Sequence, residues 1–214
     1  MDGLQSGSST EEVLAAFGAD SSSLANRTVI MTGATAGIGK ATATALAGLG
    51  CTLVCGCRNS EKGRALVLGI EEELQGGLTS PSVFVPPLEL SDLDSVRAFV
   101  ADVGPRLASG EWPPLYALVL NAGLINLDGS FSSEDGMEDT FRTNHLAHFL
   151  LTQLLLPYLR AGAPSRVVPS PGNLYAPSLN LPLFWGPLMT SSFPGVGSRR
   201  VRFSMDLQLL YNYV

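Results

Sequence analysis

Short apolar runs alternate with helix-forming stretches along the first 160 residues of the chain. Runs rich in apolar and β-branched residues predict strands, at residues 27–33, 51–57, 82–90, 115–123 and 165–168. The stretches between them predict helices, at residues 38–48, 60–74, 92–103 and 132–160. The run LYALVLNAG at 115–123 is apolar at nearly every position, which is typical of strands covered by helices on both faces. The alternation therefore predicts an α/β fold with a doubly wound parallel sheet of about five strands.

Capping residues and prolines set the expected boundaries. Ser60 is expected to cap the helix over 60–74, and Asp92 to start the helix over 92–103. No proline precedes Pro81, whereas seven of the fourteen fall between Pro164 and Pro194. Because proline lacks the N–H that helices and sheets use, we expect an irregular segment over residues 169–208. The chain then divides into an N-terminal extension, 1–26, and one domain, 27–214.

Composition excludes several classes of protein. Of the 214 residues, 45% are apolar and 15% are charged, a balance that excludes a disordered chain. The formal net charge of −6 disfavours a nucleic-acid surface, and no apolar run approaches the roughly 18 residues of a transmembrane segment. The first 20 residues hold four acidic residues and no lysine or arginine, so neither a secretory signal nor a transit peptide is expected. A cytoplasmic protein is the default expectation.

The three cysteines predict buried thiols. Cys51, Cys55 and Cys57 are spaced so that a strand would place all three on one face. Three cysteines so close together do not form a disulfide framework. A metal site would lack a fourth ligand, because His145 and His148 are far away in the sequence. We therefore expect no metal, and we expect the two histidines to pack.

A glycine-rich loop joins the first predicted strand to the first predicted helix. It reads TGATAGIG at 32–39, and the residues expected to bind a ligand there are Thr32, Gly33, Thr35, Gly37, Ile38 and Gly39. Glycines let the backbone turn sharply and approach a pyrophosphate, which the free N–H groups and positive end of the helix stabilise. The alternative is a tight turn without a ligand.

Four motifs in order give the chain a resemblance to a known family. They are the TGxxxGIG spacing, Asn121-Ala122-Gly123 after the fourth strand, Asn144 in TNHLAHFLLTQLL, and RVV at 166–168. The sequence resembles the short-chain dehydrogenases/reductases, and STEEVLAAFGAD, CRN at 57–59 and TNHLAHF are similar to its retinol-dehydrogenase-like and WW-domain-containing-oxidoreductase-like branch. The resemblance implies a Rossmann fold, truncated at the C-terminus, that lacks the last strands of the family.

The end of the second predicted strand bears on the choice of coenzyme. Arg58 lies about twenty residues past the glycine loop, where an acidic residue would bind a free ribose hydroxyl and an arginine would bind a 2′-phosphate. NADP(H) is therefore predicted over NAD(H), the alternative being a solvated surface arginine. The resemblance also implies coenzyme contacts from Asn59, from Glu89 and Leu90 near the adenine, and from Asn121, Ala122 and Gly123 at the groove floor. Asn121 could equally fix a turn at a strand end.

The resemblance implies hydride transfer between nicotinamide and a lipophilic alcohol or carbonyl compound. Relatives use a tyrosine, a lysine four residues later, a serine and an asparagine. Tyr211 in LLYNYV, Ser170 and Asn144 are the nearest matches here, although Ser170 could be an ordinary turn residue and Asn144 could simply bond backbone. None of the five tyrosines is followed by lysine at the fourth position, and for Tyr211 that position would be 215.

Two other outcomes stay open for the 214 residues. One is a catalytically inactive nucleotide-binding or scaffold protein that lacks the tyrosine–lysine pair, and the other is an unstable fragment. A homodimer is possible, although the helix that relatives usually pair with the one over 132–160 is missing.

Overall fold

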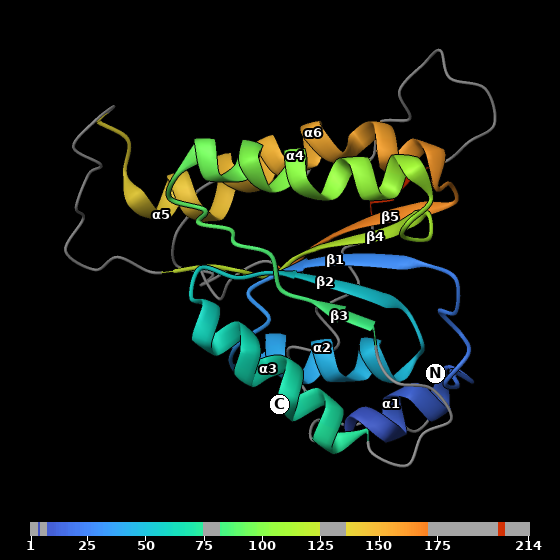
Figure 1. Cartoon of the computed structure of the whole chain (residues 1–214). Coiled ribbons are helices and arrows are strands. Elements are labelled where there is room, and N and C mark those ends of the chain that lie inside the picture. Colours follow the sequence, from blue (N-terminus) through green and yellow to red (C-terminus); the bar gives the residue numbers. More distant parts are fainter. Residues whose placement is uncertain (1–3, 5–7, 75–81, 125–135, 171–200, 204–214) are drawn as a thin grey trace.

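The computed structural model describes residues 4, 8–74, 82–124, 136–170 and 201–203. These residues form one parallel sheet with the strand order β3-β2-β1-β4-β5-β6 (Figure 1). The strands are β1 Thr28–Thr32, β2 Thr52–Gly56, β3 Ser82–Phe84, β4 Leu115–Leu120, β5 Ser165–Pro169 and β6 Val201–Phe203. The order reverses direction between β1 and β4, and such a switch point is where open α/β sheets bind ligands. The predicted doubly wound parallel sheet is confirmed.

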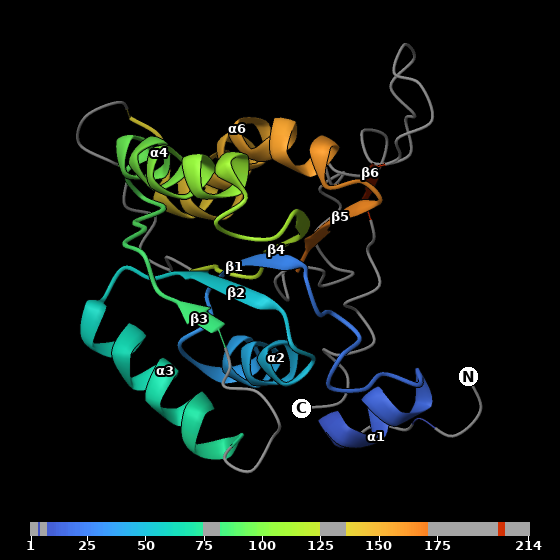
Figure 2. The ribbon, with the colours of Figure 1, turned by 45° about the vertical axis from the view of Figure 1, so that its right-hand side comes forward.

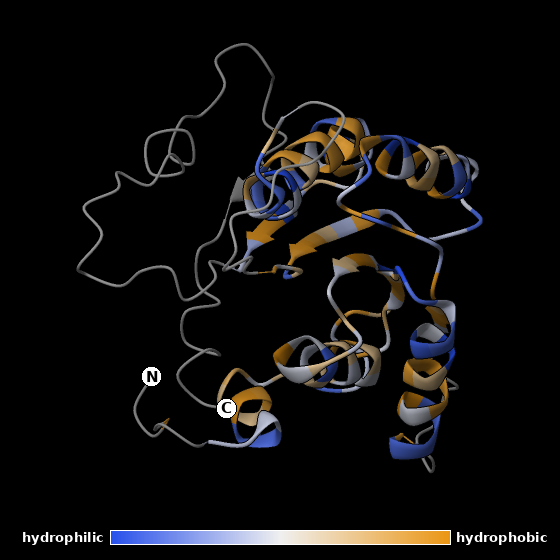
Figure 3. Ribbon diagram, turned by 90° about the vertical axis from the view of Figure 1, so that its left-hand side faces the viewer, coloured by the Kyte–Doolittle hydropathy of each residue, from blue (hydrophilic) through white to orange (hydrophobic). Residues whose placement is uncertain are grey.

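Helices cover both faces of the sheet (Figures 1 and 2). On one face lie α2 Gly37–Gly48 and α3 Ser60–Glu73; on the other lie α4 Leu93–Ser109 and α6 Ala147–Ala161. Figure 3 shows hydrophobic strands between the two helix layers. All five residues of β1 are buried, with Ile30 in the core beneath α4 and α6, and with Val29 and Met31 in the core beneath α2 and α3. This burial on both faces explains why the strands have apolar sequences without alternation.

Several element boundaries differ from the predicted ones. The third strand ends at Phe84 instead of residue 90, because Pro86 and Pro87 follow and cannot donate to a ladder. The helix that begins after Asp92 runs to Ser109 instead of 103. It continues past Gly104, where a Cβ would lie 2.5 Å from the hydroxyl oxygen of Tyr158, so that glycine allows α4 to pack closely against α6.

The N-cap of α3 was assigned wrongly from the sequence. Asn59, not Ser60, caps this helix, and its side chain accepts a hydrogen bond of 2.9 Å from the N–H of Lys62. Both residue types cap helices well, and Ser60 is instead the first residue of the helix.

The long helix predicted over 132–160 is shorter and is not uniform. A short helix α5, Asp139–Phe141, begins after Glu138, whose carboxylate accepts from the N–H groups of Thr140 and Phe141. A π-helical segment, η1 Arg142–Leu146, then leads into α6. Residues 132–135 lie outside the described residues, and α1, Thr10–Ala16, lies within the predicted N-terminal extension.

A sixth strand adds to the five predicted from the sequence. Residues 201–203 pair in parallel with β5, in register from Ser165↔Val201 to Val167↔Phe203 (Figure 2). This short strand falls inside the segment 169–208 that was expected to be irregular, and it covers the edge of β5. Within the described parts of the chain, no helix is long and apolar enough to cross a membrane.

Burial disfavours the reactive thiolate form of the three cysteines in the folded chain. All three thiols are free and buried, as predicted, and Cys51 donates to the carbonyl of Leu46 at 3.2 Å. Burial raises the pKa of Cys51 to about 12, and it also raises the pKa of Cys55 and Cys57.

We expect an aromatic disulfide reagent at pH 8 to label all three thiols more slowly in the folded chain than in urea, and Cys51 about a thousand times more slowly, because the thiolate is the reactive form. The measurement is the absorbance of the released aromatic thiolate over time. Rapid release from the folded chain would contradict the burial of the three side chains.

Candidate functional site

The N-terminus of α2 lacks the side-chain cap that α1, α3, α4 and α5 have. No side chain caps it at Ala36, and no acidic residue lies in its first turn. In α1, α3, α4 and α5 a side chain accepts from the first N–H groups, and each has an acidic residue in the first turn. The N–H groups of Gly37, Ile38 and Gly39 therefore have no acceptor within the helix, and nothing in its first turn neutralises the positive end. An anion at this point would satisfy both requirements.

Glycine is required at the three loop positions for two different reasons, close packing and a positive φ angle. Gly33 has φ +71°, and a Cβ there would lie 2.6 Å from the Cα of Ala122. A Cβ on Gly39 would collide with the carbonyl oxygen of Gly33 and lie 2.6 Å from Nδ2 of Asn121. Gly37 also has a positive φ, +50°, but a Cβ there would meet nothing within 4 Å. Two glycines thus pack the loop against the end of β4, whereas the third is exposed beside open space.

Thr32 ties the end of β1 to the end of β4. Its Oγ1 accepts from the N–H of Asn121 at 3.1 Å and from the N–H of Ala122 at 3.0 Å. The Nδ2 of Asn121 in turn donates to the carbonyl of Gly33 at 3.0 Å. These bonds fix the two strand ends at the switch point of the sheet. Thr35 and Ile38 are half-buried on the same loop, and Gly123 is exposed after β4.

Arg58 and Glu89 lie together after β2 and β3. The Nε of Arg58 is 3.5 Å from Oε2 of Glu89, and the arginine side chain is 76% exposed. The other carboxylate oxygen of Glu89 accepts from the N–H and the hydroxyl of Ser91, at 3.1 and 2.8 Å. Two predicted neighbours have other structural roles, because Asn59 caps α3 and the side chain of Leu90 is buried in the core.

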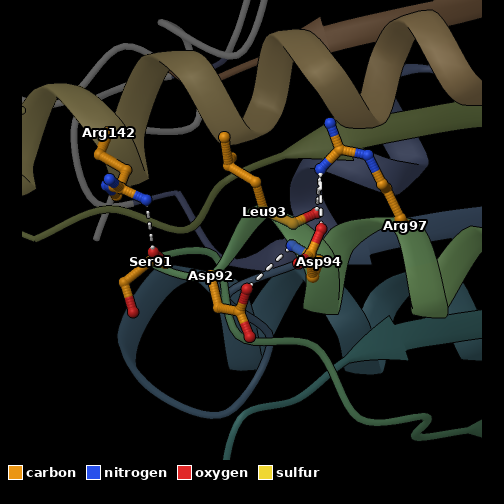
Figure 4. Close-up of polar contacts among 6 residues, drawn as sticks. All are labelled: Ser91, Asp92, Leu93, Asp94, Arg97 and Arg142. Carbon is orange, nitrogen blue, oxygen red and sulfur yellow. Dashed lines mark hydrogen bonds and ion pairs between the residues drawn. The ribbon is translucent and has the colours of Figure 1, made fainter. Parts of the chain in front are cut away.

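The π-helical segment connects to the loop that carries Glu89. Arg142 is buried, and its Nη1 donates to the carbonyl of Ser91 at 3.3 Å (Figure 4). One residue later, Asp92 caps α4 by accepting from the N–H of Asp94 at 2.8 Å. The start of α4 and the segment η1 are therefore held beside each other.

Asn144 pairs with backbone far away in the sequence. Its Oδ1 accepts from the N–H of Leu124 at 2.9 Å, and its Nδ2 donates to the carbonyl of Leu124 at 2.8 Å. Asn144 lies in η1, where the N–H of Ala147 reaches back five residues to the carbonyl of Arg142. Such π-helical turns occur frequently at functional sites. The carboxamide thus binds the loop after β4, not the neighbouring backbone of its own helix.

Of the other two predicted catalytic residues, the structure describes one. Ser170 follows β5, is half-buried, and donates its N–H to the carbonyl of Leu120 at 2.9 Å, which sets it beside the end of β4. Tyr211 lies outside the described residues.

His148, which the sequence predicts only to pack within the fold, also lies in this region. It is 3% exposed, and its ring contacts Oγ1 of Thr32 through Nε2 and the carbonyl of Asn144 through Nδ1, both at 3.0 Å. Burial lowers its pKa to about 4. Its position four residues after Asn144 places it one turn along the helix, which is the one signal that could have linked the two. The described residues contain no group of three or more His, Cys, Asp or Glu able to hold a metal ion.

Comparison with known proteins decides the family. A family model described as short chain dehydrogenase matches residues 27–169, which include every strand from β1 to β5. The chain belongs to the short-chain dehydrogenase family. The matched residues include the glycine loop at 32–39 and the π-helical segment.

Individual relatives agree with this assignment. Retinol dehydrogenase 14 of Mus musculus is 38% identical over 164 residues, which cover 74% of this chain and 47% of that protein. Retinol dehydrogenase 11 of Homo sapiens is 40% identical over 145 residues, covering 68% and 42%. This short-chain dehydrogenase chain thus spans less than half the length of these two curated relatives.

A solved structure has the same fold. A metagenomic short-chain oxidoreductase, solved in complex with NADP, superposes with a TM-score of 0.56 at 28% identity, covering 69% of this chain and 62% of that one.

Proposed function

We propose that the chain binds a nicotinamide dinucleotide at the switch point of the sheet, with NADP(H) preferred over NAD(H). The associated reaction is hydride transfer between the nicotinamide and a lipophilic alcohol or carbonyl compound. One observation carries the proposal: α2 alone among α1 to α5 begins without a side-chain cap or an acidic first turn, behind a glycine loop that leaves open space at Gly37. The retinol dehydrogenases among its relatives support the substrate class, since retinol is a lipophilic alcohol.

The residues present fit such a coenzyme. The N–H groups of Gly37, Ile38 and Gly39 would hold its diphosphate, and the exposed guanidinium of Arg58 would pair with a 2′-phosphate. The bound nicotinamide would supply the hydride donor or acceptor. Thr32 and Asn121 keep the loop closed against β4, so the chain itself contributes the shape of the site.

The preference for NADP(H) makes Arg58 the residue to replace. Changing Arg58 to alanine is expected to weaken NADPH binding about tenfold or more, because a charge-assisted hydrogen bond of roughly 1.5–3 kcal/mol is lost. NADH binding should change by less than about threefold, since it offers only a hydroxyl there. Fluorescence titration of both coenzymes measures the two dissociation constants.

Arg64 provides a matched control. It is an exposed arginine on α3, and its change to alanine should leave both constants unaltered. Equal affinity of the unmodified chain for the two coenzymes would refute the preference.

A second candidate function is coenzyme binding without turnover. Lys40 and Lys62, the two lysines of the 214 residues, lie in α2 and α3. The fourth residue after Tyr116, Tyr158 and Tyr175 is leucine, glycine and leucine. A tyrosine with its ordinary pKa of about 10 is ionised in roughly one molecule per thousand at pH 7. Without a nearby cation, that side chain is a poor proton carrier.

One experiment separates the two functions. The purified chain is titrated with NADPH and NADH, and is then incubated with NADPH and a series of aldehydes that includes retinal. Turnover that is lost when Tyr211 is changed to phenylalanine supports the oxidoreductase. Binding without turnover supports the second candidate, and binding of neither coenzyme refutes both.

A further inference from the structure

A buried imidazole joins the coenzyme loop to the segment that carries Asn144. We infer that His148 is a positioning residue, which holds Thr32 and Asn144 in register through one fixed tautomer, with the proton on Nδ1 and an accepting Nε2. This role rests on the proposed function, because it concerns the geometry of the coenzyme loop.

The hydrogen bonds of Thr32 determine the direction of the first contact. A hydroxyl has one proton to donate and two lone pairs to accept with. The N–H groups of Asn121 and Ala122 both point at Oγ1 of Thr32, at 3.1 and 3.0 Å, and they occupy the two lone pairs. The hydroxyl proton is therefore directed at Nε2 of His148, 3.0 Å away, and Nε2 must accept.

The second contact then fixes the tautomer. A neutral imidazole with an accepting Nε2 carries its proton on Nδ1. The Nδ1 of His148 is 3.0 Å from the carbonyl oxygen of Asn144, which can only accept. Both ring nitrogens thus have the partner that this tautomer requires. The other tautomer would direct an N–H at a hydroxyl with no lone pair left, and would leave a carbonyl oxygen facing a lone pair.

The same count of hydrogen-bond donors and acceptors disfavours a protonated, charged ring of His148. An imidazolium donates from both nitrogens, so its Nε2 proton would face Oγ1 of Thr32, whose acceptor positions are already used. The ring is also 3% exposed, and charge in such a place is poorly solvated. The lowered pKa of His148 agrees with this picture.

The consequence is a continuous chain of contacts across the site. It runs from Gly33 through Asn121 to Thr32, then through His148 to Asn144, and ends at Leu124. His148 joins the Thr32 end of this chain directly to the η1 end, beside the backbone connection that runs from Asn121 to Leu124. Neutral His148 thereby contributes to the position of the glycine loop relative to Asn144, and its role is assigned through these two residues, not through contact with the coenzyme.

Three substitutions of His148 test its contacts with Thr32 and Asn144 separately. His148→Phe keeps the ring volume and removes both. His148→Gln places an amide oxygen near the position of Nε2 and keeps the acceptor for Thr32, whereas His148→Asn places an amide N–H near the position of Nδ1 and keeps the donor for Asn144. We expect His148→Phe and His148→Asn to weaken NADPH binding about tenfold, and His148→Gln to stay within about threefold of the unmodified chain.

The ring itself provides a readout that a space-filling role would not give. In the full chain labelled with nitrogen-15, the two ring nitrogens of His148 should show a protonated Nδ1 and an unprotonated Nε2 at neutral pH. The reverse assignment, or two protonated nitrogens, would overturn the inference. So would NADPH binding by folded His148→Phe with unchanged affinity.

Two further outcomes also test the role assigned to His148. If His148→Phe does not fold, the comparison of the Gln and Asn variants takes its place, and equal affinities in those two would overturn the inference. If the unmodified chain binds neither coenzyme, the proposed function fails. The ring nitrogens of the free chain then still decide whether the hydrogen bonds run as assigned.

Discussion

Replacing Gly39 with alanine is expected to lower NADPH affinity about a hundredfold or more and to destabilise the fold. The added Cβ would collide with the carbonyl oxygen of Gly33 and lie 2.6 Å from Nδ2 of Asn121, so the loop must move away from β4. A loop displaced in this way misplaces the N–H groups of the first turn, and each charge-assisted bond lost costs roughly 1.5–3 kcal/mol. Overpacking costs about 1–3 kcal/mol of stability, which the helix preference of alanine offsets by at most about 1 kcal/mol.

Gly69→Ala is the matched control for this substitution. Gly69 also lies inside a helix, α3, but a Cβ there meets only Nζ of Lys40, at 4.0 Å. Its stability should rise by about 0.5–1 kcal/mol with no change in coenzyme affinity. Urea unfolding and NADPH titration of both variants make the comparison. If Gly39→Ala behaved like Gly69→Ala, the close approach of α2 to the end of β4 would be disproved.

Acidification is expected to remove about 3 kcal/mol of stability through His148 alone. Burial lowers the pKa of this ring from 6.5 to about 4 in the folded chain. Below pH 6.5 the unfolded chain binds a proton that the folded chain does not, so the free energy of unfolding falls with falling pH until the folded ring titrates near pH 4. Above pH 6.5 the ring is neutral in both states, and this contribution is complete and constant. The magnitude follows from about 1.4 kcal/mol per pH unit.

The comparison with His148→Gln isolates this contribution. Asp20 and Glu138, whose pKa values are lowered by hydrogen bonds, lose their stabilisation at lower pH in both proteins. The difference between the unfolding free energies of the two chains, measured in urea at intervals from pH 7.5 to 4.5, should therefore shrink as the pH falls. Parallel curves would show that the ring does not stay neutral in the fold.

The local sequence pattern was sufficient to predict the parallel sheet and to locate the glycine loop. The residues of β1 and β4 are apolar at nearly every position because helices cover both faces, so the sequence itself records their place in the middle of the sheet. The loop at 32–39 could be located for a similar reason, since the turn and its close contacts admit only glycine at fixed positions.

Contacts between distant residues could not be predicted in the same way. Thr32 and His148 are 116 positions apart, and Asn144 and Leu124 are 20 apart, so no periodicity links them. The π-helical segment escaped prediction because its residues are also compatible with an ordinary helix, which tertiary contacts override. β6 escaped because a three-residue strand leaves too short a pattern to detect.

The pairing of Asn144 with Leu124 has a consequence for how this region opens. The N–H and the carbonyl of Leu124 are both bound to one side chain, and that side chain is anchored in a helical segment continuous with α6. Residue 124 can therefore leave its place only if both of these hydrogen bonds break together, whereas surface loops ordinarily open by small local fluctuations. We expect the amide hydrogen of Leu124 to exchange with solvent more slowly than those of ordinary surface loops, because exchange requires Asn144 to release it.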